Sequence, residues 1–276
     1  MEEGLLRQEG GLRTRNITKK TLPGKPLVSI ITVVFNGVKT LEETILSVVQ
    51  QSYNNIEYIV IDGGSSDGTL DIIRKYDEKL DYWTSEPDAG LYDAMNKGIL
   101  LSSGDYVGFL NADDFFADSQ SVKWNIERLL TDNLDAVFAQ LDIVHPQNIH
   151  RILRRYRVKR FDSFMLRFGV MPPHPTFYCR RSCYKKFGEA PYRTDLRIAA
   201  DFELLVKLLL IQKISWGYIS KTTVRMRAGG ISSGNIKSRL LLNREIIRAC
   251  NQNGLYTNFL FLLLKIPLRL FEYFPR

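Results

Sequence analysis

Hydrophobic residues near the start of the chain follow two successive patterns. The run "LVSIITVVF", which begins at Leu27, is continuously apolar and rich in β-branched residues, as is typical of a strand buried on both faces of a sheet. From Leu41 to Val49 apolar residues recur at helical spacing, and Thr40 and Glu43 at the start of this segment are spaced as a capping box. The pattern therefore predicts a buried strand followed by an amphipathic helix.

The same alternation continues through the first half of the chain. We predict further strands at "IEYIVID", "YWTSE" and "DYVGFL", and further helices at "TLDIIRKY" and "GLYDAMNKGILLSSG". Strands that alternate with helices in this way indicate an α/β fold with a doubly wound, mostly parallel sheet. In such sheets ligands bind beyond the carboxyl ends of the strands.

The composition is that of an ordinary globular protein. The chain has 276 residues, of which 45% are hydrophobic and 25% charged, enough for one sizeable core. Three cysteines are too few for a disulfide framework, which favours a reducing, cytoplasmic compartment. We expect neither a signal peptide nor a membrane span, because the longest apolar run, "FLFLLLKIPLRLF", is interrupted by Lys265, Pro267 and Arg269.

A net charge of +8 indicates either a solvated basic face or an anionic partner. Basic residues are concentrated in segments 151–167 and 180–186. Nucleic acid, an anionic membrane surface and a phosphorylated substrate are all candidate partners. Nucleic acid is disfavoured because the arginines and aromatic residues are not arrayed as a stacking platform.

Polar residues follow three of the predicted strands. The first strand ends in Asn36, the second in Asp62 and the loop "GGSSDGT", and the fourth in "NADD", residues 111–114. Because adjacent carboxylates repel each other and are costly to dehydrate, Asp113 and Asp114 predict a divalent cation such as Mg²⁺ or Mn²⁺. For each motif taken singly, a helix-capping loop or a surface turn is the alternative.

Several blocks in uninterrupted order carry a family resemblance. "PLVSIITVVFNGVKTLEETILSVVQQSYNNIEYIVIDGGSSDGT", "SEPDAGLYDAMNKGI" and "GDYVGFLNADD" resemble the family 2 glycosyltransferases of the GT-A fold, in particular bacterial members that build exopolysaccharides and surface polysaccharides. The resemblance covers residues 26–116. It implies a Rossmann-like nucleotide-sugar half at 26–116, an acceptor half at 117–232, and inverting sugar transfer from a nucleoside diphosphate sugar.

The resemblance also suggests roles for individual positions. It implies that Asp113 is the principal metal and diphosphate ligand, with Asp114 beside it, although Asn111 departs from the first Asp of the family's Asp-x-Asp motif. Gly63 replaces a second Asp that often recognises the nucleobase, so the base is left open. The positions matched to the nucleotide-sugar site are Thr32, Phe35, Asn36, Asp62, Gly63, Asp93, Asn96, Lys97, Asn111, Ala112 and Asp113.

The second half must supply a base for the acceptor hydroxyl. Asp201 begins the helical segment "DFELLVKLLL", where an N-cap is the structural alternative. Relatives carry their catalytic base at the start of a helix in this place, so the resemblance favours Asp201, with Glu203 as the second candidate. It also suggests an acceptor-side loop at His174 and a mobile loop, "RMRAGGISS", in which Arg225 or Arg227 meets phosphate. We disfavour a zinc site at His174 and the nearby cysteines, because no second cysteine pair follows.

We divide the chain into a mobile, polar lead-in at 1–25, a glycosyltransferase domain at 26–232 and a helical segment at 233–276. The last segment ends in "LYTNFLFLLLKIPLRLFEYFPR", which is aromatic, aliphatic and basic. It is suited to lying on an anionic membrane, and relatives often use acceptors anchored on undecaprenyl diphosphate. The alternative is a helix that covers the core or forms a homo-oligomer. For the whole chain, a nucleotidyltransferase of sugar phosphates or a non-catalytic basic binding protein is the alternative function.

Overall fold

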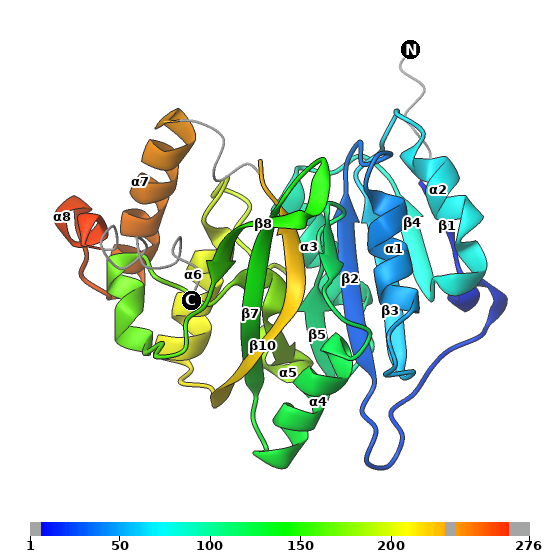
Figure 1. Cartoon of the computed structure of the whole chain (residues 1–276), viewed down its shortest axis with the longest axis horizontal. Coiled ribbons are helices and arrows are strands. Elements are labelled where there is room, and N and C mark those ends of the chain that lie inside the picture. Colours follow the sequence, from blue (N-terminus) through cyan, green and yellow to red (C-terminus); the bar gives the residue numbers. More distant parts are fainter. Residues whose placement is uncertain (1–6, 230–235, 265–276) are drawn as a thin grey trace.

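The computed structural model of the chain describes residues 7–229 and 236–264. Within these ranges, ten strands form one mixed sheet in the order β1-β4-β3-β2-β5-β9-β7-β10-β6, and β8 pairs with residues 141–145 of β7, beyond the short stretch that pairs with β9 (Figure 1). The strands are β1 (Gln8–Gly10), β2 (Val28–Val34), β3 (Ile56–Asp62), β4 (Tyr82–Ser85), β5 (Tyr106–Phe109), β6 (Asp114–Phe116), β7 (Ala136–His145), β8 (Asn148–Tyr156), β9 (Tyr178–Arg180) and β10 (Trp216–Arg227).

Helices cover both faces of this sheet (Figure 1). The α-helices are α1 (Leu41–Val49), α2 (Thr69–Lys75), α3 (Leu91–Leu101), α4 (Ser121–Thr131), α5 (Arg181–Lys185), α6 (Ala200–Val206), α7 (Ile236–Gln252) and α8 (Phe259–Leu263). Shorter helical turns are η1 (Leu12–Arg15), η2 (Asp77–Lys79), η3 (Ser163–Phe168), η4 (His174–Thr176) and the π-helical η5 (Lys207–Ile211).

The predicted α/β fold with a mostly parallel sheet is confirmed. Strand β2 pairs in parallel with both β3 and β5, and β3 pairs in parallel with β4. Strands β7 and β10 are also parallel to each other, whereas β1, β6 and β9 run antiparallel to their neighbours. The four predicted strands of the first half therefore end at one edge of the sheet.

Two hydrophobic layers hold the sheet between its helices. All seven residues of β2 are buried, as the continuous apolar run predicted. One layer joins the sheet to α1, α2 and α4 through residues such as Ile45, and the other joins it to α3, α6 and α7 through residues such as Met95 and Phe202. Each such side chain contributes about 1.5–3 kcal/mol to the stability of the fold when it is fully buried. The apolar positions that predicted the strands and helices contribute to both layers.

The expectation of a mobile lead-in does not hold for residues 7–25. Strand β1 pairs with β4 at the edge of the sheet. The Arg13 guanidinium donates a hydrogen bond of 2.6 Å to the Leu101 carbonyl oxygen and forms an ion pair with the buried Glu57. Lys19 pairs with the buried Asp81 at 2.8 Å. The segment is ordered because the buried carboxylates of Glu57 and Asp81 need cationic partners. Glu57 lies in β3 and Asp81 directly precedes β4, so both carboxylates become buried only when these strands pair.

The described part of the C-terminal segment is helical, as expected. Helix α7 packs against α6, and α8 packs against η3. Residues 230–235, which include the last four residues of the predicted mobile loop (225–233), and 265–276, within the predicted membrane-binding tail, lie outside the described residues. None of the helices in the described ranges combines the length and the apolar composition needed to cross a bilayer.

Candidate active site

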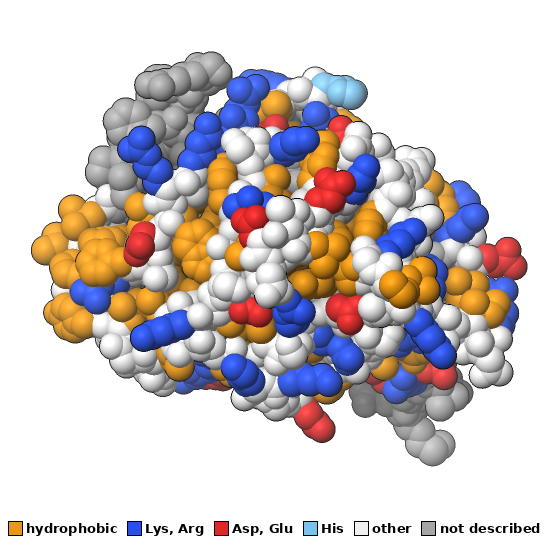
Figure 2. Space-filling view, turned by 90° about the horizontal axis from the view of Figure 1, so that it is seen from below, with side chains coloured by type: hydrophobic (Ala, Val, Ile, Leu, Met, Phe, Trp, Pro, Cys, Tyr) orange, Lys and Arg blue, Asp and Glu red, His pale blue; other side chains and the backbone are white. Residues whose placement is uncertain are grey.

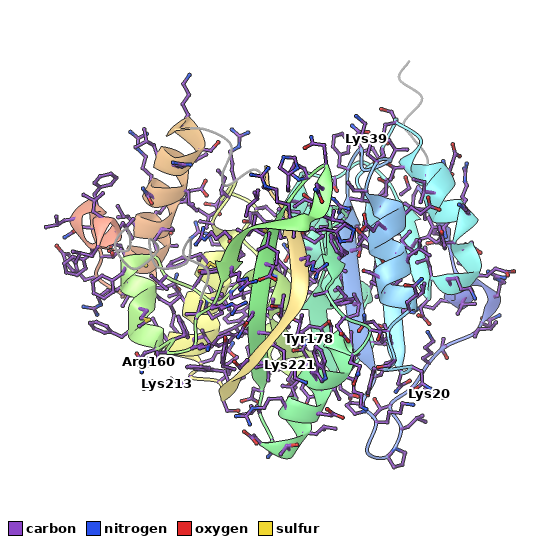
Figure 3. All side chains as sticks on the ribbon, in the orientation of Figure 1. Lys20, Lys39, Arg160, Tyr178, Lys213 and Lys221 are labelled. Atoms are coloured by element: carbon purple, nitrogen blue, oxygen red, sulfur yellow. The ribbon has the colours of Figure 1, made fainter. Side chains whose placement is uncertain are left out.

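A cleft of about 740 Å³ opens at the edge of the sheet where the parallel strands end. Figure 3 labels Lys39 at this edge and Lys20 at the opposite edge. Helices α3 and α6 supply the other wall of the cleft. Of the residues singled out from the sequence, those lining it are Phe35, Asn36, Gly63, Asn111, Ala112, Asp113, Asp114, His174, Asp201 and Arg227.

The loop that follows β3 is tied to the end of β2. The Asn36 backbone N–H donates to Ser65 Oγ at 2.7 Å, and the Ser66 N–H donates to Asn36 Oδ1 at 3.0 Å. Asp62 is fully buried beneath this loop and accepts hydrogen bonds from Ser65 N–H at 3.1 Å and Ser85 Oγ at 2.6 Å. Asp62 does not line the cleft. Its hydrogen bonds instead stabilise the loop that carries Gly63.

Four more of the expected nucleotide-sugar residues lie outside the cleft. Thr32 is buried, with its hydroxyl 3.1 Å from that of Tyr58. Asn96 exchanges two hydrogen bonds with the backbone of Tyr192, at 2.8 and 2.9 Å, and thereby joins the two halves of the domain. Asp93 and Lys97 form an ion pair at 3.5 Å on the outer side of α3.

The geometry of α3 explains this difference. The side chains of α3 that line the cleft are those of Leu91, Tyr92, Ala94 and Met95. Successive residues of a helix point in directions about 100° apart, so positions 93, 96 and 97 face elsewhere. The motif therefore lies in a helix that borders the cleft, but the side chains at these three positions do not line it.

The segment 111–114 brings two carboxylates to the cleft with few protein partners. Asp113 is open to the cleft, whereas Asp114 is fully buried. No donor in the described part of the chain has hydrogen-bond geometry toward either carboxylate oxygen of Asp114, and Asn111 Oδ1 has no partner there either. The pKa of Asp114 is raised well above its usual range, mainly because of burial and secondarily because of Asp113. The Arg227 backbone N–H and the Asn111 side chain lie near Asp114 and lower its pKa by a smaller amount.

These oxygens fit a divalent cation, because unpartnered carboxylate and amide oxygens are the ligands that Mg²⁺ and Mn²⁺ prefer. Among the described residues, no group of three or more His, Cys, Asp or Glu side chains could hold a metal ion by itself. A cation here would therefore complete its coordination with substrate oxygens and water, as is usual for Mg²⁺ bound with phosphates.

Arg227 is the cationic side chain of this end of the cleft. Its guanidinium donates to the Asp113 carbonyl oxygen at 2.5 Å and pairs with Glu43. It also lies 5.0 Å from the centre of the Phe115 ring. Arg227 is thus held in place at the cleft, whereas Arg225, the other arginine expected to meet phosphate, does not line it.

Asp201 lies in the first turn of α6 and faces the cleft. Burial raises the pKa of its carboxyl group to about 6. The Tyr92 hydroxyl lies 3.4 Å from Asp201 Oδ1. Helix α6 has Ala199 as its N-cap, so the N-cap alternative for Asp201 does not hold.

Glu203, the second candidate base, is excluded by its position. It is buried outside the cleft, where it pairs with Lys207 at 2.9 Å and accepts a hydrogen bond from Asn253 Nδ2 at 3.1 Å. His174 lines the cleft, but its Nε2 is 2.7 Å from the Tyr192 hydroxyl and burial lowers its pKa to about 4. A neutral His174 therefore shapes the wall of the cleft together with Tyr192.

Sequence reasoning missed the support behind Asp201. Glu245 of α7 accepts hydrogen bonds from three consecutive backbone N–H groups, those of residues 197, 198 and 199, at 2.9, 2.9 and 3.0 Å. On the other side of this loop, the Tyr92 hydroxyl donates to the Ile198 carbonyl oxygen at 2.6 Å. The segment leading into Asp201 is therefore held from both sides. No local signal marks Glu245, because it lies more than forty residues further along the chain.

Comparison with known protein families shows to which family the chain belongs. The description "Glycosyl transferase family 2" matches residues 29–187, which is more than half of the chain. The chain is a family 2 glycosyltransferase. The predicted family and enzyme class are thereby confirmed. The matched residues begin in β2 and end just after α5.

Relatives and solved structures agree with this family 2 membership. An uncharacterized glycosyltransferase of Mycobacterium tuberculosis is 35% identical over 191 residues, which cover 67% of this chain and 70% of the relative. The crystal structure of Staphylococcus aureus TarS 1–349 in complex with UDP-GlcNAc has a TM-score of 0.64 at 19% identity, covering 83% of this chain and 68% of that one. A mannosyltransferase of Pyrobaculum calidifontis in complex with GDP-Man and Mn²⁺ has a TM-score of 0.62 at 18% identity, covering 86% and 66%. These likenesses confirm the GT-A fold.

Proposed function

We propose that this family 2 glycosyltransferase moves a sugar from a nucleoside diphosphate sugar to a saccharide hydroxyl with inversion at the anomeric carbon. The observation that carries the proposal is that Asp113, the buried Asp114 with its unpartnered oxygens, and the half-buried Asp201 line the same cleft. One end of the cleft is suited to a diphosphate with its cation, and the other end to a proton acceptor. The solved complexes of TarS with UDP-GlcNAc and of the mannosyltransferase with GDP-Man and Mn²⁺ support this choice of donor.

At the donor end, Asp113 and Asp114, together with Asn111, are the residues that would hold Mg²⁺ or Mn²⁺. The bound ion supplies positive charge that stabilises the departing nucleoside diphosphate. Arg227 adds a fixed cation beside Asp113 and strengthens the same effect. The chain itself thus binds and orients the diphosphate so that the anomeric carbon faces the acceptor.

At the acceptor end, Asp201 acts as the general base. Its carboxylate takes the proton of the acceptor hydroxyl while that oxygen forms a bond to the anomeric carbon. The bond from the anomeric carbon to the diphosphate oxygen breaks, and the leaving group departs with the electron pair. Attack from the face opposite the leaving group inverts the anomeric configuration. A pKa of about 6 leaves most of Asp201 deprotonated near neutral pH while keeping it basic enough to accept the proton.

A panel of nucleoside diphosphate sugars, tested with and without Mn²⁺, measures this function. We expect one of them to raise the melting temperature in the presence of Mn²⁺, because a ligand at a hundred times its Kd stabilises the folded state by about 2.7 kcal/mol. With an acceptor sugar present, the enzyme should release nucleoside diphosphate. If the enzyme transferred no sugar from these donors but released inorganic diphosphate from a nucleoside triphosphate and a sugar phosphate, it would be a nucleotidyltransferase and the proposal would be contradicted.

We also propose that the acceptor is lipid-linked, on a carrier such as undecaprenyl diphosphate, and that the enzyme contacts the inner face of the cell membrane. The support is an exposed apolar surface on and beside α8, at the left end of Figure 2. It consists of Phe164, Tyr256, Phe259, Leu260, Leu263 and Leu264. Exposed basic side chains of α7, at positions 237, 239, 244 and 248, are close in sequence to it. An apolar surface accompanied by positive charge suits an anionic bilayer.

Co-sedimentation with lipid vesicles tests the membrane contact. We expect the enzyme to bind vesicles that contain anionic lipid, and Leu260→Glu to weaken binding at least about tenfold, because burial of a leucine side chain contributes about 1.5–3 kcal/mol. Leu260 is 66% exposed, so the substitution should not disturb folding. Leu100→Glu on α3, where the side chain is 57% exposed, is the matched control and should bind as the wild type does. Equal binding by Leu260→Glu would refute this contact.

A further inference from the structure

The carboxylate of Asp88 lies where a side chain at position 63 would otherwise extend into the cleft. A Cβ atom added to Gly63 would lie 2.7 Å from Asp88 Oδ2 and 3.1 Å from its Cγ. Both residues line the cleft. The carboxylate of Asp88, which comes from the turn between β4 and α3, therefore fills the space that a side chain at position 63 would occupy.

Asp88 is held in this position by its surroundings. Its Oδ1 accepts a hydrogen bond from the Gly90 N–H at 2.8 Å, which forms the turn before α3. The backbone beside it is also fixed, because the Gly63 N–H donates to the Val34 carbonyl oxygen at 2.9 Å. Oδ2, the oxygen nearest to Gly63, is thereby directed to a defined point in the cleft.

The charges around Asp88 exclude a phosphate at this end of the cleft. The acidic groups that act on its carboxylate are those of Asp62 and Asp93, and the basic one is Lys97. Lys97 is itself paired with Glu86 at 3.4 Å and with Asp93 at 3.5 Å. An acidic pocket of this kind repels phosphate and favours a hydrogen-bond donor. The phosphates of a donor nucleotide therefore lie toward Asp113 and Arg227, and its nucleoside lies toward Asp88.

Phe35 provides a surface on which a planar base can stack. It follows Val34 at the end of β2, next to the end of β3, where Val34 and Asp62 are register partners. Its side chain is 67% exposed and lines the cleft. An exposed aromatic side chain and a carboxylate that line the same cleft match the two properties of a nucleobase, a flat apolar face and a polar edge.

We propose that Asp88 recognises the nucleobase of the donor by accepting a hydrogen bond from a ring N–H group. The inference rests on the proposed function, since it assumes that a nucleoside diphosphate sugar binds in the cleft. Uracil and guanine carry such a ring N–H on their pairing edge. Cytosine and adenine carry a bare ring nitrogen there, which would face the carboxylate with no proton between them. Gly63 is required because any side chain at that position displaces Asp88.

Calorimetric titration with UDP, GDP, CDP and ADP in the presence of Mn²⁺ tests the assignment. We expect UDP or GDP to bind at least about tenfold more tightly than CDP and ADP, the effect of a hydrogen bond to a charged group. Asp88→Asn keeps the acceptor for Gly90 N–H but can present an amide N–H to the base. It should weaken the preferred nucleotide about tenfold and leave CDP and ADP unweakened. Equal weakening of all four nucleotides would overturn base recognition.

A swap of the two positions provides an independent check. Gly63→Ala should weaken UDP or GDP as Asp88→Asn does, because the new Cβ displaces the carboxylate. Gly63→Asp combined with Asp88→Ala should recover the preference for UDP or GDP, since a carboxylate then returns from the other side. Asp71→Asn, an exposed position on α2 with the same change of charge, is the control and should bind as the wild type does.

The outcomes separate this inference from the proposed function. If the wild type binds none of the four nucleotides, the donor site is absent and both proposals fail. If it binds one of them tightly and Asp88→Asn leaves that affinity and the base preference unchanged, the nucleotide donor stands and the role of Asp88 is refuted.

Discussion

Asp113→Asn is expected to lower sugar transfer at least about a thousandfold and to abolish the effect of Mn²⁺ on donor binding. Asp113 is the carboxylate of the 111–114 segment that is open to the cleft. Removing its charge leaves a buried Asp114 and a neutral Asn111 to hold a cation, and charge stabilisation by a metal is worth several kcal/mol. Steady-state kinetics and titration with the donor nucleotide, each with and without Mn²⁺, measure the two effects.

Asp132→Asn is the control for Asp113→Asn. Asp132 is exposed at the end of α4, where it pairs with Arg128 at 2.8 Å, and it does not line the cleft. It should retain full transfer. If Asp113→Asn also retained transfer and Mn²⁺ dependence, the metal assignment would be wrong and the unpartnered oxygens of Asp114 would need another explanation.

Asp201→Asn is expected to lower kcat by about 10²–10⁴-fold while leaving the Kd of the donor nucleotide unchanged. General base catalysis contributes a factor of this size, and asparagine keeps the volume of the side chain but cannot accept the proton. Because burial raises the pKa of Asp201 to about 6, the wild-type rate should fall as the pH drops through 6. Below that pH the base is protonated, so the rate should decrease about tenfold per pH unit.

Glu203→Gln is the matched control for the loss of a carboxylate in α6. Glu203 is paired with Lys207 outside the cleft, so this variant should lose stability but keep most of its turnover and the same dependence on pH. Normal turnover by Asp201→Asn, or an unchanged pH profile, would contradict the assignment of Asp201 as the base.

Much of the first half of the fold follows from local pattern. The β-branched run from Leu27 is buried along its whole length, and the helices of residues 41–49 and 91–101 begin where their apolar periodicity begins. The second half was less predictable. Strand β9 is only three residues long, and none of the residues of β8 is fully buried. Short or solvent-exposed strands lack the alternating or continuous apolar signal on which the prediction depends.

The candidate site shows the same division. Asn36, Asp113 and Asp201 all line the cleft. Asn36 and Asp113 were selected because ligands bind beyond strand ends in such sheets, and Asp201 was selected by the family resemblance. Thr32 and Asn96 were assigned to the site by motif, yet both are buried in contacts with tyrosines. A motif states which element carries a residue, but the direction of each side chain depends on how that element packs.

The sequence alone was sufficient to predict the family, the α/β class and the strand ends that line the cleft. These predictions rest on short motifs and on the hydrophobic pattern within each element, which are local properties of the sequence. Three features depended on contacts between distant segments: the edge strand that residues 8–10 add to the sheet, the hold of Glu245 on the loop before Asp201, and the placement of Asp88 over Gly63. Each joins groups that lie far apart in the sequence and meet only after the sheet has formed. The free energy of burying a charge or a polar group is set by that environment, and local sequence does not contain it.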